Sequence, residues 1–151
     1  MIFRNALAQA ILAGRKSQTR RIARKGELLS RNGHGHPAVV VPGPNGSRIR
    51  YQVGNVYAVQ NGRGLKAIGR IRLMSISSEH LQEISPIEAA MEGVEPDYMP
   101  SPWGLQPAYL PPFRRLWDRI HPKRPERWED DPLVWALTFK LEGENDARHE
   151  T

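Results

Sequence analysis

The most informative stretch of the chain is Gly14-Arg15-Lys16-Ser17-Gln18-Thr19-Arg20-Arg21-Ile22-Ala23-Arg24-Lys25-Gly26. It holds six cationic side chains and two hydroxyls, and it contains no carboxylate. Because like charges this dense repel one another, the stretch forms either a solvated arm or a surface that a polyanion such as nucleic acid neutralises. The hydroxyls allow a third interpretation. A lysine crowded by arginines is disfavoured in its protonated form, so Lys16 could act as a base toward Thr19.

The residues before this stretch predict a helix. Apolar side chains recur at helical spacing from Arg4 to Ala13, and Gly14 stands where a helix C-terminus favours a residue that tolerates positive φ. Residues three apart face the same way on a helical turn but opposite ways on a strand. Lys16 and Thr19 can therefore meet only if the chain is coiled or turned after Gly14.

The rest of the chain alternates strand patterns with helical ones. Five strands are expected, the first two forming a hairpin, over residues 37–41, 49–53, 56–60, 66–74 and 135–141, the last as a half-buried closing strand. Ser85-Pro86-Ile87-Glu88 is a capping box that opens a helix, and an apolar stripe predicts another helix over residues 110–120. Between them, residues 95–112 are rich in proline and are expected to form a long loop.

These elements predict a single α+β domain over residues 1–141, built on a small, mostly antiparallel β-barrel with flanking helices. Within it, residues 95–131 are a proline-rich insertion with one helix, and residues 142–151 are expected to be a flexible acidic tail.

Composition narrows the classes of function. The 151 residues carry a net charge of +6, and Glu27 is the only acidic residue among the first 75, as expected of one basic functional face. The absence of cysteine excludes disulfides and thiolate chemistry. His34-Gly35-His36 lacks a third ligand at metal-binding spacing, so neither metal nor cofactor is expected. No stretch is apolar enough for a membrane span or signal peptide, which predicts a soluble, cytoplasmic protein with no membrane partner.

Several motifs, in order, resemble the ASCH domain family. The stretch Ile11–Arg21 is similar to its signature of an apolar helix end, Gly-Arg-Lys-Thr, one residue, then Thr and Arg, with Ser17 at the first threonine. Tyr51-Gln52-Val53-Gly54-Asn55 resembles the family's hydrophobic-x-x-Gly-Asp segment, residues 84–93 its acidic helix, and residues 131–139 its last strand. The version with Thr19-Arg20-Arg21 is similar to ASCH proteins often encoded by phages and prophages.

This resemblance implies a PUA-like barrel with a cleft associated with RNA. Some bacterial ASCH proteins are amidohydrolases that remove the acetyl group of N4-acetylcytidine, and others have been described as ribonucleases. By resemblance, the catalytic residues are Lys16, Thr19 and Glu92. The partner is then RNA or a modified nucleoside. The expected contacts to nucleic acid or substrate are Arg15, Ser17, Arg20, Arg21, Tyr57, Arg70 and Arg72.

Three hypotheses of function follow. The first is a hydrolase of an acylated cytidine or of single-stranded RNA, centred on Lys16, Thr19 and Glu92. The second is a non-catalytic RNA-binding module that uses Lys16 and the arginines at positions 15, 20, 21, 70 and 72 as phosphate contacts. The third is a phage protein that binds a host protein through the proline-rich segment and Trp103.

Overall fold

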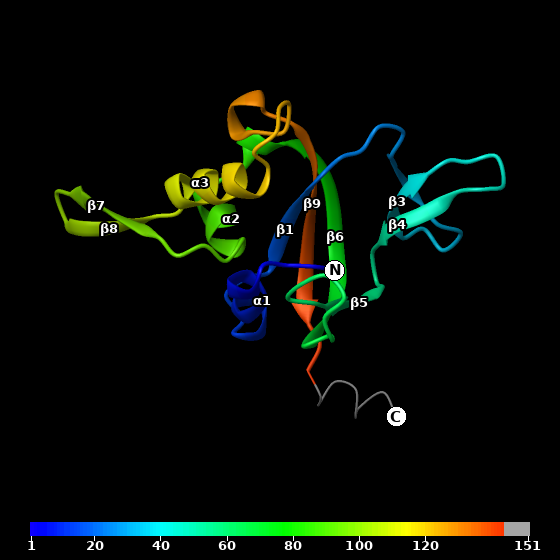
Figure 1. Ribbon diagram of the computed structural model, residues 1–151, viewed down its shortest axis with the longest axis horizontal. Helices are drawn as coiled ribbons and strands as arrows, with labels where there is room; N and C mark the ends of the chain where they lie inside the picture. The colour runs from blue at the N-terminus through cyan, green and yellow to red at the C-terminus, as the bar shows by residue number, and fades with distance from the viewer. Residues whose placement is uncertain (144–151) are drawn as a thin grey trace.

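The computed structural model describes residues 1–143, and its centre is a four-stranded antiparallel sheet of order β1-β9-β6-β5 (Figure 1). The strands are β1 (Gln18–Ile22), β5 (Val56–Val59), β6 (Gly69–His80) and β9 (Leu133–Leu141). Strands β6 and β9 are the longest pair, and their register shifts between Leu73 and Ser75. The strand predicted over residues 66–74 thus begins later in the structure, at Gly69, and continues to His80.

Strand β9 lies in the middle of this sheet, so the prediction of a half-buried closing strand is only partly right. Val134, Trp135, Ala136 and Leu137 are all buried, which a strand with one solvent face does not allow. The reason is that β9 has strands on both sides and packed layers on both faces. Strand β9 contributes to three separate apolar clusters. Val134 belongs to one, Trp135 and Leu137 belong to a second, and Phe139 belongs to the third.

A second sheet has the order β2-β3-β4, and the expected barrel is not formed. Its strands are β2 (Leu28–Arg31), β3 (Pro37–Val41) and β4 (Arg48–Gln52), so the predicted hairpin is present. The α+β class is confirmed. Within residues 1–143, however, β1 and β5 remain the edges of the first sheet, and no ladder of backbone hydrogen bonds joins either edge to the second sheet. Closing a barrel requires such a continuous ladder. A side chain of the second sheet does contact the first: Arg50 Nη1 of β4 donates a hydrogen bond to the Ile22 carbonyl at the end of β1.

Within residues 1–143, three α-helices lie beside the main sheet (Figure 1). They are α1 (Asn5–Leu12), α2 (Pro86–Met91) and α3 (Leu110–Ile120), with short 3₁₀ turns η1 (Leu81–Glu83) and η2 (Trp128–Asp130). The capping box is confirmed, because the Ser85 hydroxyl accepts from the Glu88 N–H and the Glu88 carboxylate accepts from the Ser85 N–H. Phe113 and Trp117 of α3 pack with α2 and with Val134 of β9.

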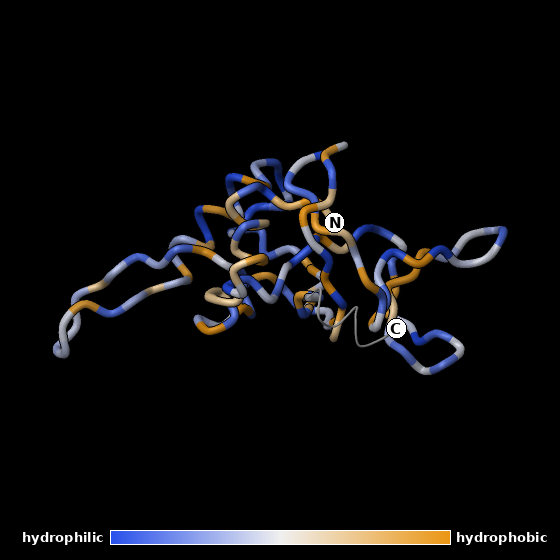
Figure 2. The backbone as a smooth tube through the Cα atoms, turned by 90° about the horizontal axis from the view of Figure 1, so that it is seen from below, coloured by the Kyte–Doolittle hydropathy of each residue, from blue (hydrophilic) through white to orange (hydrophobic). Residues whose placement is uncertain are grey.

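The segment 95–112 is not a loop, because it contains the two-stranded hairpin β7 (Asp97–Ser101) and β8 (Gly104–Ala108). Both strands are edges, so Pro100 and Pro107 can occupy positions that a central strand would reject. The hairpin projects away from the rest of the molecule, as both views show (Figures 1 and 2). The helix expected at residues 110–120 is present.

The remaining expectations concern the ends and the membrane. The Glu142 N–H donates to the Arg70 carbonyl, and residues 144–151 of the expected tail lie outside the described part of the chain. Among residues 1–143, no helix is both long enough and apolar enough to cross a bilayer.

Candidate functional site

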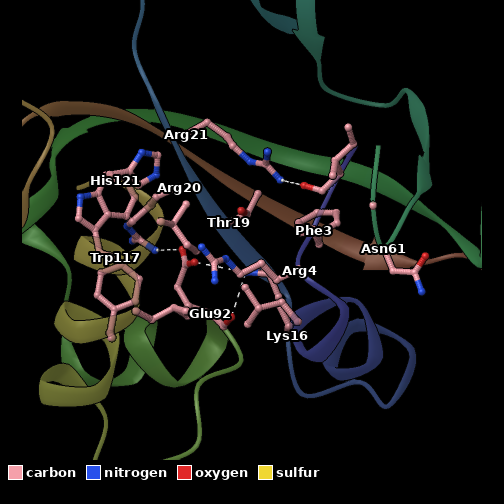
Figure 3. Close-up of a pocket in the computed structure, with 16 residues that line it drawn as sticks. Phe3, Arg4, Lys16, Thr19, Arg20, Arg21, Asn61, Glu92, Trp117 and His121 are labelled. Atoms are coloured by element: carbon pink, nitrogen blue, oxygen red, sulfur yellow. Dashed lines mark hydrogen bonds and ion pairs between the residues drawn. The ribbon is translucent and has the colours of Figure 1, made fainter. Parts of the chain in front are cut away.

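A cavity of about 410 Å³ lies between β1, the N-terminal segment and α3 (Figure 3). This volume is within the range of small-molecule sites. The lining residues fall into a polar floor and an apolar wall. The floor residues are Lys16, Thr19, Arg20, Arg21, Asn61 and Glu92; the wall includes Phe3, Leu7, Phe113, Leu116, Trp117, Ile120 and His121.

Lys16 is delivered to the floor by the turn that follows α1. Gly14 has φ +79°, and the N–H groups of Arg15 and Lys16 both donate to the Ala10 carbonyl. Lys16 therefore precedes β1 while Thr19 lies within it, and both line the cavity. This arrangement satisfies the expected condition that the chain be turned after Gly14.

Gly93 makes the close approach of Lys16 possible. Its φ is +91°, which L side chains rarely adopt, and a Cβ there would lie 2.7 Å from the Lys16 Cβ. The glycine after Glu92 is thus required both by the backbone and by the packing.

The Lys16 ammonium is buried, with 1% of its side chain exposed. Its Nζ donates to the Gln18 carbonyl at 2.6 Å, to the Glu92 carbonyl at 2.9 Å and to Glu92 Oε1 at 3.2 Å. Burial lowers the pKa of Lys16, the Glu92 carboxylate opposes this, and Arg21 and Arg20 lower it further. The crowding arginines therefore act in the direction predicted from the sequence, but desolvation is the larger cause.

Arg20 is fully buried and holds three carboxylates. Its Nη1 donates to Glu92 Oε2 at 2.9 Å, its Nη2 to Glu88 Oε2 at 2.7 Å, and its Nε to Glu79 Oε1 at 2.8 Å. Glu92 is consequently clamped, with one oxygen on Lys16 and the other on Arg20. The geometry gives Arg20 the role of orienting Glu92 rather than of meeting solvent.

The Thr19 hydroxyl lies at the centre of the floor and is free to react or to bind (Figure 3). Thr19 is 5% exposed and is fixed by the pairing of β1 with Leu137 of β9. Its hydroxyl makes no hydrogen bond with any of the described residues, although every fully buried polar side-chain atom among them has a partner. A nearly buried hydroxyl without a partner costs free energy unless a ligand or water satisfies it.

Arg21 borders the cavity above Thr19 (Figure 3). Its Nη2 donates to the Ile2 carbonyl at 3.0 Å, and its guanidinium lies 4.9 Å from the centre of the Phe3 ring. In the described part of the chain it has no carboxylate partner within ion-pair distance. Burial lowers the pKa of Arg21, Tyr51 and Glu92 oppose this, and nearby Arg50 lowers it further. Arg21 is therefore a cation available to an anionic or carbonyl group.

The other expected contact residues lie outside the cavity lining. Arg15 pairs with Glu95 on the surface, and the Tyr57 hydroxyl accepts from the Gln52 N–H. Arg70 is exposed on β6, and Arg72 pairs with Glu142. The fifth, Ser17, is half-buried beside Lys16, and its backbone bonds to Met91 and Phe139.

Sequence reasoning missed the cavity wall. Trp117 is a core residue of the helix predicted over residues 110–120, but it also lines the cavity, as does His121. His121 directly follows the apolar stripe of α3, and this position is the sequence feature that could have marked it as a residue of the cavity wall.

A second feature is a basic lobe, defined as residues 23–52, which includes the sheet β2-β3-β4. Its one carboxylate, Glu27, is 2% exposed and is bound by Arg50 and by the Trp135 indole. Four further cations of the lobe are exposed: Arg24, Lys25, Arg31 and Arg48. The lobe thus offers positive charge to solvent with no exposed carboxylate.

Solved structures relate the chain to known proteins. An ASCH domain from Lactobacillus crispatus is 22% identical, with a TM-score of 0.51, and the match covers 91% of this chain and 70% of that one. A protein of the DUF984 family model from Enterococcus faecalis is 15% identical, with a TM-score of 0.53 and the same coverage. The chain has an ASCH-like fold. The resemblance noted in the sequence is thereby confirmed for the fold.

No model of a known protein family matches the chain, and neither does any curated protein. Within residues 1–143, the ASCH-like fold brings together no group of histidines and carboxylates that could hold a metal ion.

Proposed function

We propose that the protein recognises a pyrimidine nucleoside, free or in single-stranded RNA, and hydrolyses the acyl amide of an acylated cytidine in the cavity. The observation that carries the proposal is that the Thr19 hydroxyl, which has no hydrogen-bond partner among the described residues, and the buried amine of Lys16 line the floor of the same cavity. A planar base suits the aromatic wall formed by Phe113 and Trp117.

The chemistry begins with Thr19. Neutral Lys16 takes the hydroxyl proton while Oγ1 attacks the acyl carbon, and Arg21 stabilises the oxyanion that forms. The C–N bond then breaks, the leaving amine takes its proton from Lys16, and the acyl group remains on Thr19. Water hydrolyses this ester, so the net products are a carboxylic acid and cytidine.

Lys16 must lose a proton for this step, and the buried environment favours that loss. A neutral amine has two N–H donors, so it releases one of its three acceptors and can offer its lone pair to the Thr19 hydroxyl. Glu92, held by Arg20, keeps Lys16 in place throughout.

The basic lobe favours a second candidate, a non-catalytic RNA-binding module. The exposed cations of a lobe whose one carboxylate is buried suit the phosphate backbone. In that case the cavity holds an unstacked base and no bond is cleaved.

The test is hydrolysis of N4-acetylcytidine, followed by chromatographic separation of cytidine. Thr19→Val keeps the β-branched shape on β1 but removes the hydroxyl, and it should abolish turnover; Thr19→Ser should retain part of it. Lys16→Met should also be inactive. Binding of N4-acetylcytidine without turnover by the wild type would reject the hydrolase and leave the binding module.

A further inference from the structure

His121 is a titratable residue of the cavity wall that the proposed chemistry does not use. It caps the C-terminus of α3, and its backbone N–H donates to the Trp117 backbone carbonyl at 2.7 Å. Its ring lies against the Trp117 ring, with centroids 4.1 Å apart and planes inclined by 31° (Figure 3). The side chain is 22% exposed.

Glu126 fixes both aromatic rings. The Trp117 indole N–H donates to the Glu126 carbonyl at 2.7 Å, while the Glu126 carboxylate lies 3.5 Å from His121 Nδ1. The Glu126 N–H is itself bound, to the Lys123 carbonyl. This closed triangle orients the imidazole and assigns its Nδ1 proton to the side facing the carboxylate.

The second ring nitrogen, Nε2, has no hydrogen bond with a described residue, and the ring lines the cavity. With the proton on Nδ1, neutral Nε2 is a hydrogen-bond acceptor. The floor, by contrast, is rich in donors, because each Glu92 carboxylate oxygen already accepts from Lys16 or Arg20 and Arg21 can only donate.

We infer that His121 is a specificity-determining residue: its unprotonated Nε2 accepts a hydrogen bond from an N–H or O–H group of the ligand. For a cytidine, that donor is the exocyclic amine or a ribose hydroxyl. The inference rests on the proposed function, since it places a nucleoside in the cavity.

Burial keeps the imidazole neutral near pH 7. Burial lowers the pKa of His121 from 6.5, Glu126 opposes this, and Arg21 of β1 lowers it further. The other charged groups that line the cavity are Arg4, Lys16, Arg20 and Glu92. Acidification through the lowered pKa removes the acceptor, so ligand affinity should fall on the acid side and stay constant above it.

The experiment is calorimetric titration of cytidine between about pH 5 and about pH 8. His121→Phe keeps a ring against Trp117 but lacks the acceptor, and it should bind about tenfold more weakly at pH 8 with no dependence on pH. His121→Gln places a non-titrating carbonyl near Nε2, so it should restore affinity and stay independent of pH. If His121→Phe matches the wild type at every pH, the inference is rejected while nucleoside recognition stands.

A second probe pair separates the two proposals. If neither cytidine nor N4-acetylcytidine binds the wild type, nucleoside recognition is rejected, and phenol and toluene then test the cavity by NMR. Phenol has an O–H donor and toluene has none. A preference for phenol that falls in His121→Phe supports the acceptor role, and an unchanged preference overturns it.

Discussion

The buried charges around Glu92 depend on one another, so removing the Glu92 carboxylate should destabilise the fold. Glu92 neutralises Lys16 and Arg20 from a position where 8% of its side chain is exposed. Removing one partner of a buried ion pair leaves an uncompensated charge, whereas exposed pairs contribute little. The cluster therefore links the folding of the chain to the geometry of its candidate catalytic residues.

Glu92→Gln should lower the free energy of unfolding by about 3–5 kcal/mol, because two buried cations lose their shared carboxylate. Urea denaturation followed by circular dichroism measures this loss. Glu95→Gln is the matched control, since its pair with Arg15 is exposed, and it should cost less than about 1 kcal/mol. Equal losses in the two variants would contradict the structural role assigned to Glu92.

Glu88 gives the fold a defined acid sensitivity. Burial raises the pKa of Glu88, but hydrogen bonds from Ser85 and the charge of Arg20 lower it more, so the net pKa is below 4.5. Its ionised form therefore stabilises the fold above the unfolded pKa, and this contribution is lost as pH falls through the lower folded-state value. In acid titrations of stability, Glu88→Gln should show a shallower decline than the wild type. A decline of the same steepness would show that Glu88 is not responsible.

At the scale of single elements, two tryptophans of residues 95–131 have opposite roles. Trp103 stands at the tip of the β7–β8 hairpin and is 88% exposed, whereas Trp117 of α3 is 4% exposed. Trp103→Ala should change the free energy of unfolding by less than about 0.5 kcal/mol and remove the tryptophan most accessible to iodide quenching. Trp117→Ala should cost about 3–5 kcal/mol. A large loss for Trp103→Ala would mean that the hairpin packs against the body of the molecule.

The elements also show how far sequence reasoning reaches. Ser85 and Gly14 act through neighbours a few residues away, so the start of α2 and the end of α1 were predictable from local patterns. Strand β1 was not, because its cationic sequence is compatible with a strand only after Arg20 has met carboxylates from β6 and α2.

The candidate site also has a part that could be predicted from the sequence and a part that could not. Resemblance to a known family suggested that Lys16, Thr19 and Glu92 lie together, and the structure places all three on one cavity. No local pattern indicates that α3 and His121 supply the opposite wall of the cavity, because the position of His121 depends on how α3 packs against β9. Whether sheets close into a barrel likewise depends on pairing between residues far apart in the sequence. The strand patterns alone therefore could not distinguish two open sheets from a barrel.

For the whole molecule, the separation of the basic lobe from the cavity predicts how RNA affinity should depend on salt. Arg31→Ala and Arg48→Ala each remove an exposed cation of the lobe. Each should reduce the slope of log K against log salt for single-stranded RNA by about 0.7, as measured by fluorescence anisotropy. Arg124→Ala is the control, because Arg124 is already paired with Glu129 and Asp130. Unchanged slopes in both lobe variants would exclude the lobe from the interface.

The central position of β9 has a consequence for synthesis on the ribosome. Strand β1 emerges early, but its hydrogen-bonding neighbour is β9, where Gln18 pairs with Thr138. The three apolar clusters likewise wait for Val134, Leu137 and Phe139. A nascent chain that stops before Leu133 therefore holds every residue of the cavity but lacks the strand that aligns them. Such a chain should depend on chaperones, and binding should begin only after translation has passed Leu141.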